Sequence, residues 1–322
     1  MHMNRIALAL LFALLTLPVF AADAPSTPLT DEQIDKTFDE IFAQQQKITR
    51  MQAKVVTSKK GGIFNKLVQS TGYAYAQMPD RLLFVDYGEN TAEQVEAKAA
   101  IILIDGFYLW DLKPGENEGA FDVERLAMKS AGDRDINIAA LLIGADVKTG
   151  KQLREFYALT GSLDDLGAAG KSYQFNLKTL PGKEKQKRKE DVVVWIRPGE
   201  VIPWKIHSLR YTPKSVNPLQ QQTEGETQYK VTESTKEISE LQTNLSNPPL
   251  TPFAPERFFF GEFLRKYPAS KVQDGRGQEL DKATLQQELD IILSRLKGAA
   301  PAGGTPPPSS VAPAKSAVPG LE

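Results

Sequence analysis

Three short segments of the sequence are apolar at consecutive positions: Leu82–Val85, Ile101–Ile104 and Val192–Ile196. Successive side chains of a β-strand point to opposite faces of a sheet, so such strands need cover on both faces. Asp105-Gly106 precedes Phe107–Trp110 and signals a two-residue hairpin turn, in which both central residues have positive φ. Antiparallel strands are therefore expected. Either helices cover one side and a second layer the other, or one face lines a cavity.

Helical and strand patterns follow one another along the rest of the chain. Thr30 and Gln33 fit a capping box ahead of an apolar stripe, which predicts a helix over 31–46. Residues 134–160 are expected to be helical, as is an amphipathic segment near 279–297. Strand patterns are separated by turn residues and occur at Ile48–Thr57, Val68–Gln77, Arg81–Tyr87, Ala100–Ile104, Phe107–Leu112, Ser172–Leu177, Asp191–Arg197, Val201–Thr212 and Thr227–Thr235.

The two ends of the chain differ in composition from its middle. Residues 1–21 combine a positive start, the apolar run Ile6–Leu17 and small residues, which predicts a secretory signal peptide cleaved after Ala21. The apolar run is shorter than the roughly 20 residues that a spanning helix needs. Residues 22–29 are expected to be a linker, 30–265 a folded domain and 266–297 a helical extension. The Pro- and Ala-rich segment 298–322 is expected to be disordered.

Composition excludes several classes of function. The 39 Lys and Arg residues balance 40 Asp and Glu residues, which argues against a general binder of nucleic acid or anionic membranes. The absence of Cys excludes thiolate metal sites, disulfides and cysteine nucleophiles. Beyond the signal peptide only His207 remains, so no histidine metal cluster is expected.

Catalytic motifs are equally sparse. Gly170-Lys171-Ser172 ends like a phosphate-binding loop, but Asp165 stands where that motif needs glycine, and strand-like residues follow instead of a helix. A carboxylate pair such as Asp111 with Glu124 stays open as a glycosidase alternative. The expectation is a protein that is not an enzyme and has no metal or cofactor.

Two segments carry a resemblance to a known family. Gly72–Phe84 leads an aromatic strand into Met78-Pro79 and an apolar strand, and Ile102–Pro114 continues through the Asp105-Gly106 hairpin into Leu109-Trp110 and a later proline. In this order they resemble the LolA-type periplasmic carriers of outer-membrane lipoproteins. Further pieces fit the same order: Ile138–Gly144 as a lid-like helix, Tyr173–Leu180, Ile202–Ile206 and Pro252-Phe253. The likeness spans about 31–260.

The resemblance implies an α+β fold: an incomplete, strongly curved antiparallel β-barrel whose concave face is closed by helices. It also implies a periplasmic carrier, a monomer, that takes lipoprotein acyl chains or another lipid from an inner-membrane ABC exporter to an outer-membrane acceptor. No covalent step and no nucleic acid are involved. The residue before the proline, Met78, is commonly Arg in that family, where it hydrogen-bonds the lid helices shut, so this lock is not expected here.

Site residues follow from the same resemblance together with the apolar strands. Residues expected to line the lipid cavity are Tyr75, Leu82, Phe84, Ile102, Ile104, Leu109, Trp110, Val194 and Ile196. Residues expected on the lid are Ile34, Phe38, Ile138, Leu141 and Leu142. Two alternatives remain: a module of the same shape that senses lipid or lipoprotein and signals envelope stress, and a secreted hydrolase.

Overall fold

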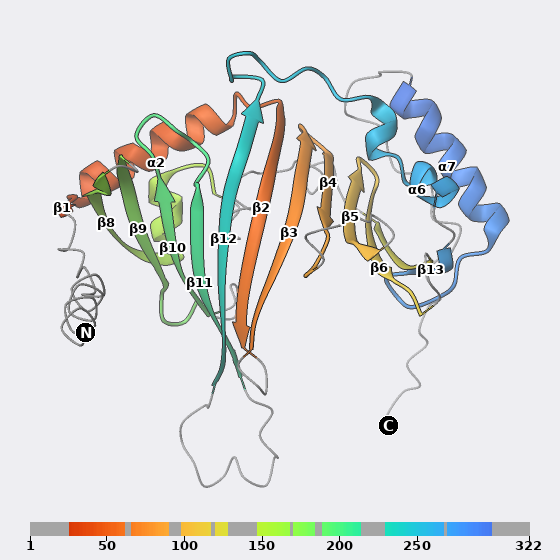
Figure 1. Ribbon diagram of the computed structural model, residues 1–322, viewed down its shortest axis with the longest axis horizontal. Helices are drawn as coiled ribbons and strands as arrows, with labels where there is room; N and C mark the ends of the chain where they lie inside the picture. The colour runs from red at the N-terminus through yellow and green to blue at the C-terminus, as the bar shows by residue number, and fades with distance from the viewer. Residues whose placement is uncertain are drawn as a thin grey trace, which may run out of the picture.

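One large sheet dominates the computed structural model, which describes residues 26–61, 66–89, 98–116, 120–127, 147–167, 170–183, 189–213, 229–266 and 269–297. Within these ranges thirteen strands form a curved, unclosed sheet in the order β1-β8-β9-β10-β11-β12-β2-β3-β4-β5-β6-β7-β13 (Figure 1). The fold is α+β, an incomplete barrel with helices, as expected.

The strands are β1 (Ser26–Pro28), β2 (Arg50–Gly61), β3 (Lys66–Gln77), β4 (Arg81–Asp86), β5 (Ala100–Asp105), β6 (Tyr108–Pro114), β7 (Phe121–Ala127), β8 (Tyr157–Asp165), β9 (Lys171–Thr179), β10 (Glu190–Ile196), β11 (Lys205–Pro213), β12 (Tyr229–Thr243) and β13 (Ala269–Asp274). The helices are α2 (Asp31–Gln45), α5 (Gly150–Arg154), η3 (Pro255–Phe258), α6 (Phe260–Lys266) and α7 (Lys282–Lys297).

Most expected elements are present, with several differences. The strand β13 lies within 266–297, where a helical extension was expected, and it pairs with β7 in parallel, so the sheet is mixed although its other pairs are antiparallel. Helix was expected through 160, but Tyr157 begins β8, because pairing with β9 overrides the local helical spacing. Strand β7 was not expected, since its polar positions mask the buried Phe121 and Val123. Ile138, Leu141 and Leu142 lie outside the described residues.

Helices cover opposite faces of this sheet in its two halves. Residues paired in antiparallel register share a face. The row Val194, Ile206, Lys236, Thr57 and Ser70 lies on the face covered by α2, which we call the α2 face. Alternation along β2, β3 and β4 puts the row Ala76, Leu82, Ile104, Leu109 and Leu126 on the same face.

The neighbouring row Tyr75, Leu83, Leu103, Trp110 and Arg125 therefore lies on the other face. There η3, α6 and α7 pack against it, and we call it the α7 face. In Figure 1, α2 extends along the β8–β10 half of the sheet, and α6 and α7 lie beside β5, β6 and β13. The sheet is covered by α2 on one face in one half and by η3, α6 and α7 on the other face in the other half. Apolar side chains are therefore needed on both faces of the sheet.

Three apolar clusters follow from this arrangement. Cluster 1, on the α7 face, packs Leu83, Trp110 and their neighbours against Phe258, Phe260 and α7. Cluster 2, on the α2 face, packs α2 against β8–β11, with the rings of Phe38 and Phe175 4.5 Å apart. The smaller cluster 3 lies on the α2 face between the two halves and contains Ile48, Met51, Ala76, Leu82, Ile104 and Ile202.

The hairpin between β5 and β6 is present, but its turn differs from the expected type. Ile104 and Leu109 form the last pair of the hairpin, so the loop has four residues. Of Asp105 and Gly106, which were both expected to have positive φ, only Gly106 does (93°). The Asp105 carboxylate closes the loop by accepting hydrogen bonds from the backbone N–H groups of Phe107 and Tyr108 (both 2.9 Å) and from Trp110 Nε1 (2.7 Å). The Asp105 side chain therefore stabilises the turn through hydrogen bonds, whereas the sequence predicted a turn defined by two residues with positive φ.

Burial of Asp105 gives the protein a pH-dependent stability. Burial raises the pKa of Asp105 from 3.8 to about 6, although the hydrogen bonds from Tyr108, Trp110 and Phe107 oppose the rise. Because the folded state holds this proton more tightly, the contribution of Asp105 to stability is greatest below pH 4 and declines as the pH rises to 6. We expect the Asp105→Asn variant to gain about 3 kcal/mol relative to the wild type between pH 3 and pH 7. Urea unfolding of both proteins at the two pH values measures this difference, and parallel pH profiles would contradict it.

Candidate functional site

A cavity of about 980 Å³ lies between the C-terminal half of α2 and the β10–β11 connection. Its volume falls within the range of about 300–1,000 Å³ typical of ligand pockets. Apolar side chains of Ile41, Ile202 and Ile238 line it, with charged groups of Glu40 and Arg197 among the lining. The full lining is Thr37, Glu40, Ile41, Ala43, Gln44, Tyr173, Arg197, Gly199, Glu200, Val201, Ile202, Pro203, Trp204, Ile238, Leu241, Thr243, Leu245 and Ser246.

The apolar lining continues from this cavity across the sheet. Ile202, Ile238 and Leu241 belong to cluster 3 as well as to the cavity wall. On the same face beyond cluster 3, Ile102 is 38% exposed and Leu126 is 41% exposed. We call this strip of apolar side chains, from the cavity through cluster 3 to β7, the α2-face band.

The middle of the α2-face band is formed by small residues, whose side chains project little from the sheet. Ala53, Ala74 and Ala76 follow one another on β2 and β3, and Gly72 continues the row. A Cβ on Gly72 would lie 2.6 Å from the Val85 carbonyl oxygen and 3.1 Å from the Phe84 ring. The half-buried Phe84 ring therefore lies close against Gly72, and a larger residue there would displace it.

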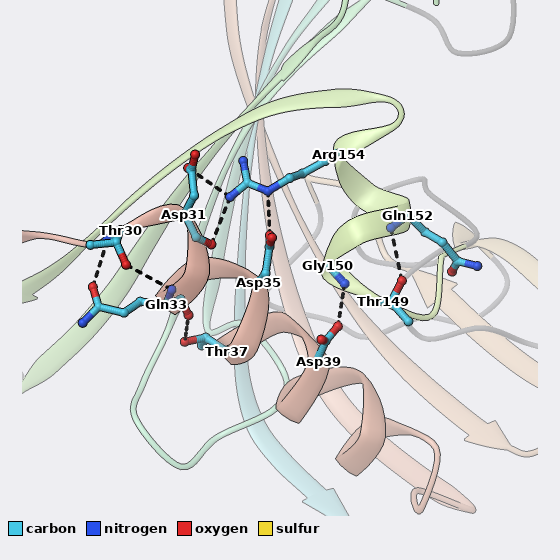
Figure 2. Close-up of polar contacts among 10 residues, drawn as sticks. All are labelled: Thr30, Asp31, Gln33, Asp35, Thr37, Asp39, Thr149, Gly150, Gln152 and Arg154. Carbon is cyan, nitrogen blue, oxygen red and sulfur yellow. Dashed lines mark hydrogen bonds and ion pairs between the residues drawn. The ribbon is translucent and has the colours of Figure 1, made fainter.

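Polar contacts fix the N-terminal half of α2 (Figure 2). The Thr30 hydroxyl accepts from Gln33 N (3.2 Å) and the Gln33 side chain accepts from Thr30 N (2.8 Å), which confirms the capping box. Arg154 of α5 donates to Asp35 (2.6 Å) and Asp31 (3.1 Å), and Asp39 accepts from Gly150 N (2.8 Å).

The approach of α5 to α2 requires glycine at position 150. A Cβ there would lie 2.9 Å from the Asp35 Cα atom. Such an approach to backbone cannot be relieved by rotating a side chain. The α5 helix therefore packs directly against the backbone of α2 at this end.

The C-terminal half of α2, which borders the cavity, is held differently. Gln45 Nε2 donates to the Val201 carbonyl oxygen at 2.7 Å, and Gln45 is buried. Met78 packs beside cluster 3, and its backbone N–H donates to the Thr49 carbonyl oxygen. The helix is thus fixed through Arg154 of α5 and the carbonyl group of Val201 in the β10–β11 connection, and neither belongs to the segment that carries Met78.

The structure divides the expected lipid-lining residues between the two faces. Leu82, Ile104 and Leu109 lie together in or beside cluster 3, and Phe84 and Ile102 lie further along the α2-face band. Val194 and Ile196 pack under α2 with the expected lid residues Ile34 and Phe38 in cluster 2.

Tyr75 and Trp110 lie on the α7 face, away from the band. The Trp110 ring stacks on Phe260 with centroids 4.1 Å apart and is fully buried, so it fills a core. The Tyr75 ring lies 5.9 Å from that of Phe253, and the guanidinium of Arg257 stands over it. Tyr75 and Trp110 therefore lie on the opposite face of the sheet from Phe84 and Leu82 and do not line the same site.

Sequence reasoning missed the cavity wall formed by Val201–Trp204 and the C-terminal half of α2. The Pro203-Trp204 pair was recognised only as part of a resemblance. The signal available was the extra aromatic and apolar content of a connection between strands, which an ordinary turn does not need.

Groups that could support other chemistry are also placed by the structure. Asp111 and Glu124 are opposite each other on β6 and β7 on the α2 face, and Asp111 is ion-paired with Lys113 at 2.9 Å. Within the described ranges, no cluster of three or more metal-ligating side chains occurs. None of the described helices combines the length and the apolar content needed to cross a membrane.

Comparison with known proteins gives matches among solved structures. No family model matches the sequence, and no curated protein matches it either. A DUF1329 family protein from Desulfovibrio piger is 11% identical with a TM-score of 0.33, over 71% of this chain and 99% of that one. A LolA superfamily protein from Nitrosomonas europaea is 13% identical with a TM-score of 0.28, over 71% of this chain and 97% of that one.

A third match is a putative outer membrane lipoprotein-sorting protein domain from Vibrio parahaemolyticus, 10% identical with a TM-score of 0.32, over 71% of this chain and 99% of that one.

Proposed function

We propose that this chain is a periplasmic lipid carrier that binds acyl chains of lipoproteins, or of another lipid, along the α2-face band and in the cavity beside it. The observation that carries the proposal is the continuity of the 980 Å³ cavity with an apolar floor that remains partly exposed at Ile102 and Leu126. A cavity lined by apolar side chains together with a few polar groups is typical of ligand-binding sites. No covalent step is involved.

Burial of acyl chains supplies the binding energy. Each methylene group removed from water is worth about 0.8 kcal/mol, so a chain that fills the cavity and band is held firmly. Release then needs a receiving membrane or protein with higher affinity. The resemblance in sequence supports an inner-membrane exporter as donor and an outer-membrane acceptor, with this chain travelling between them as a monomer.

The C-terminal half of α2 is the element proposed to open. It borders the cavity, and the bond from Gln45 to Val201 ties it to the opposite wall. The N-terminal half stays fixed to α5 through Arg154. Moving this half outward would expose the cavity and withdraw Ile41 and Phe42 from cluster 2, while Ile34 stays packed there.

Tryptophan fluorescence tests the proposed binding site, because Trp204 lines the cavity whereas Trp110 is buried in cluster 1. A brominated fatty acid is expected to quench the wild-type fluorescence in a saturable way. The Trp204→Phe variant should lose most of this quenching. The Trp195→Phe variant is the matched control and should keep it, because Trp195 lies on the α7 face. Quenching that is absent, or equal in Trp204→Phe and the wild type, would contradict the site.

A further inference from the structure

The α2 face changes from apolar to cationic along its strands. Near the cavity, Met51 on β2 and Ile238 on β12 are apolar. Further along the same strands and their neighbours, the α2 face carries Thr57, Lys59, Ser70, Ser208, Arg210, Ser234 and Lys236, with Val68 and Glu190 among them. The floor of the proposed lipid site is therefore amphipathic, with a hydroxyl-rich and cationic end beyond its apolar part.

Lys236 lies at the boundary between the apolar part and the cationic part of the α2 face. In register it lies between Ile206 on β11 and Thr57 on β2, both of which are buried. Burial lowers the pKa of Lys236, and the charges of Lys59 and Arg210 lower it further, while Glu190 opposes them. Lys59 and Arg210 therefore both lie on the same side of the sheet as Lys236 and close enough to repel its charge.

Ion pairing leaves part of this charge uncompensated. Arg210 is paired with Glu190 at 3.5 Å. Among the residues that the structure describes, Lys236 and Lys59 form no ion pair. A partly buried cation without a counter-ion is costly, and an anion bound beside it would remove that cost.

We propose that Lys236, flanked by Lys59 and Arg210, binds the anionic head group of a lipid whose acyl chain lies along the α2-face band. This inference rests on the proposed carrier function and narrows its ligand to an amphiphile with a phosphate or carboxylate head. Hydroxyl groups of Ser208 and Ser234 lie on the same face as donors for such oxygens. Neutral acylglycerols would fill the band but leave Lys236 and Lys59 without a counter-ion.

Three ligands with the same palmitoyl chain test the head-group site: palmitate, palmitoyl-lysophosphatidylglycerol and monopalmitoylglycerol. Affinities are measured by displacement of the brominated fatty acid from the full-length protein. The wild type is expected to bind the better of the two anions at least tenfold more tightly than the neutral lipid. The anion that binds more tightly identifies the head group as carboxylate or phosphate.

The Lys236→Gln variant is expected to weaken binding of that anion about tenfold and to leave the neutral lipid unchanged. Lys60→Gln is the matched control, because Lys60 is exposed and follows Lys59 on the other face of β2. Melting temperatures check that each variant folds. Equal loss for all three ligands in Lys236→Gln, or equal affinities in the wild type, overturns the head-group site while the carrier function stands. Absence of any quenching overturns both.

Discussion

Replacing Arg125 by Met is expected to lower the free energy of unfolding by about 3–5 kcal/mol, because it leaves the Glu288 carboxylate buried without its partner. Arg125 on β7 and Glu288 on α7 form an ion pair in which both side chains are 8% exposed. The guanidinium of Arg125 also lies over the ring of Tyr108, 4.6 Å from its centroid. Urea unfolding at pH 7 measures the loss.

The size of this effect follows from the position of Glu288 on α7. Leu285, Leu289 and Ile292 on the same helix pack into cluster 1, and Glu288 lies within this inward stripe. Burial raises the pKa of Glu288, although Arg125 opposes the rise. The pair therefore holds α7 in one register against the sheet, and loss of either partner leaves a buried charge.

Two further variants make the prediction specific. The double variant Arg125→Met/Glu288→Leu is expected to recover most of the lost stability, because apolar residues of similar size can replace a buried ion pair. Lys54→Met breaks the pair with Glu240, whose side chains are 31% and 60% exposed, and is expected to cost less than about 1 kcal/mol. Equal effects of Arg125→Met and Lys54→Met would contradict a buried, structurally important pair.

Replacing Phe84 by Glu is expected to abolish binding of a fluorescent fatty-acid probe while the circular-dichroism spectrum stays near that of the wild type. Phe84 lies on the α2-face band between Ala74 on β3 and Ile102 on β5. A carboxylate here would have to lose its water when an acyl chain covers it, which costs several kcal/mol. Because Phe84 is only half-buried, the free protein can keep the new carboxylate hydrated.

The matched control for this variant is Val193→Glu. Val193 is also half-buried in a strand, but it lies on the α7 face of β10. We expect Val193→Glu to bind the probe as the wild type does. Unchanged probe binding in Phe84→Glu would remove this residue from the site, and equal loss in both variants would point to a general disturbance of the fold.

The local patterns of the sequence were sufficient to predict much of the secondary structure. The capping box at Thr30 and the hairpin between β5 and β6 depend on neighbours in sequence, and both are present. Residues 157–160 were expected to be helical because Leu153, Phe156 and Tyr157 share helical spacing. Their pairing with β9 depends on residues far along the chain, and this determined the outcome.

The grouping of site residues could not be predicted in the same way. Leu109 and Trp110 are neighbours in sequence and were expected to line one cavity, but alternation puts them on opposite faces. Which face is open depends on where α2, α6 and α7 pack, and no local pattern encodes that. Asp105, Arg125 and Glu288 are buried although their residue types are typical of surfaces. Arg125 and Glu288 pair with each other across a large distance in sequence, and Asp105 accepts hydrogen bonds within its own loop.

The central claim is that the α2-face band and its cavity carry a lipid, and mass spectrometry of the protein purified from its own cells under native conditions tests it most directly. The account predicts bound lipid or acylated peptide at about one molecule per chain, depleted in Phe84→Glu and retained in Val193→Glu. Protein that is free of lipid as isolated, and that stays free after incubation with lipids extracted from the same cells, would contradict the account.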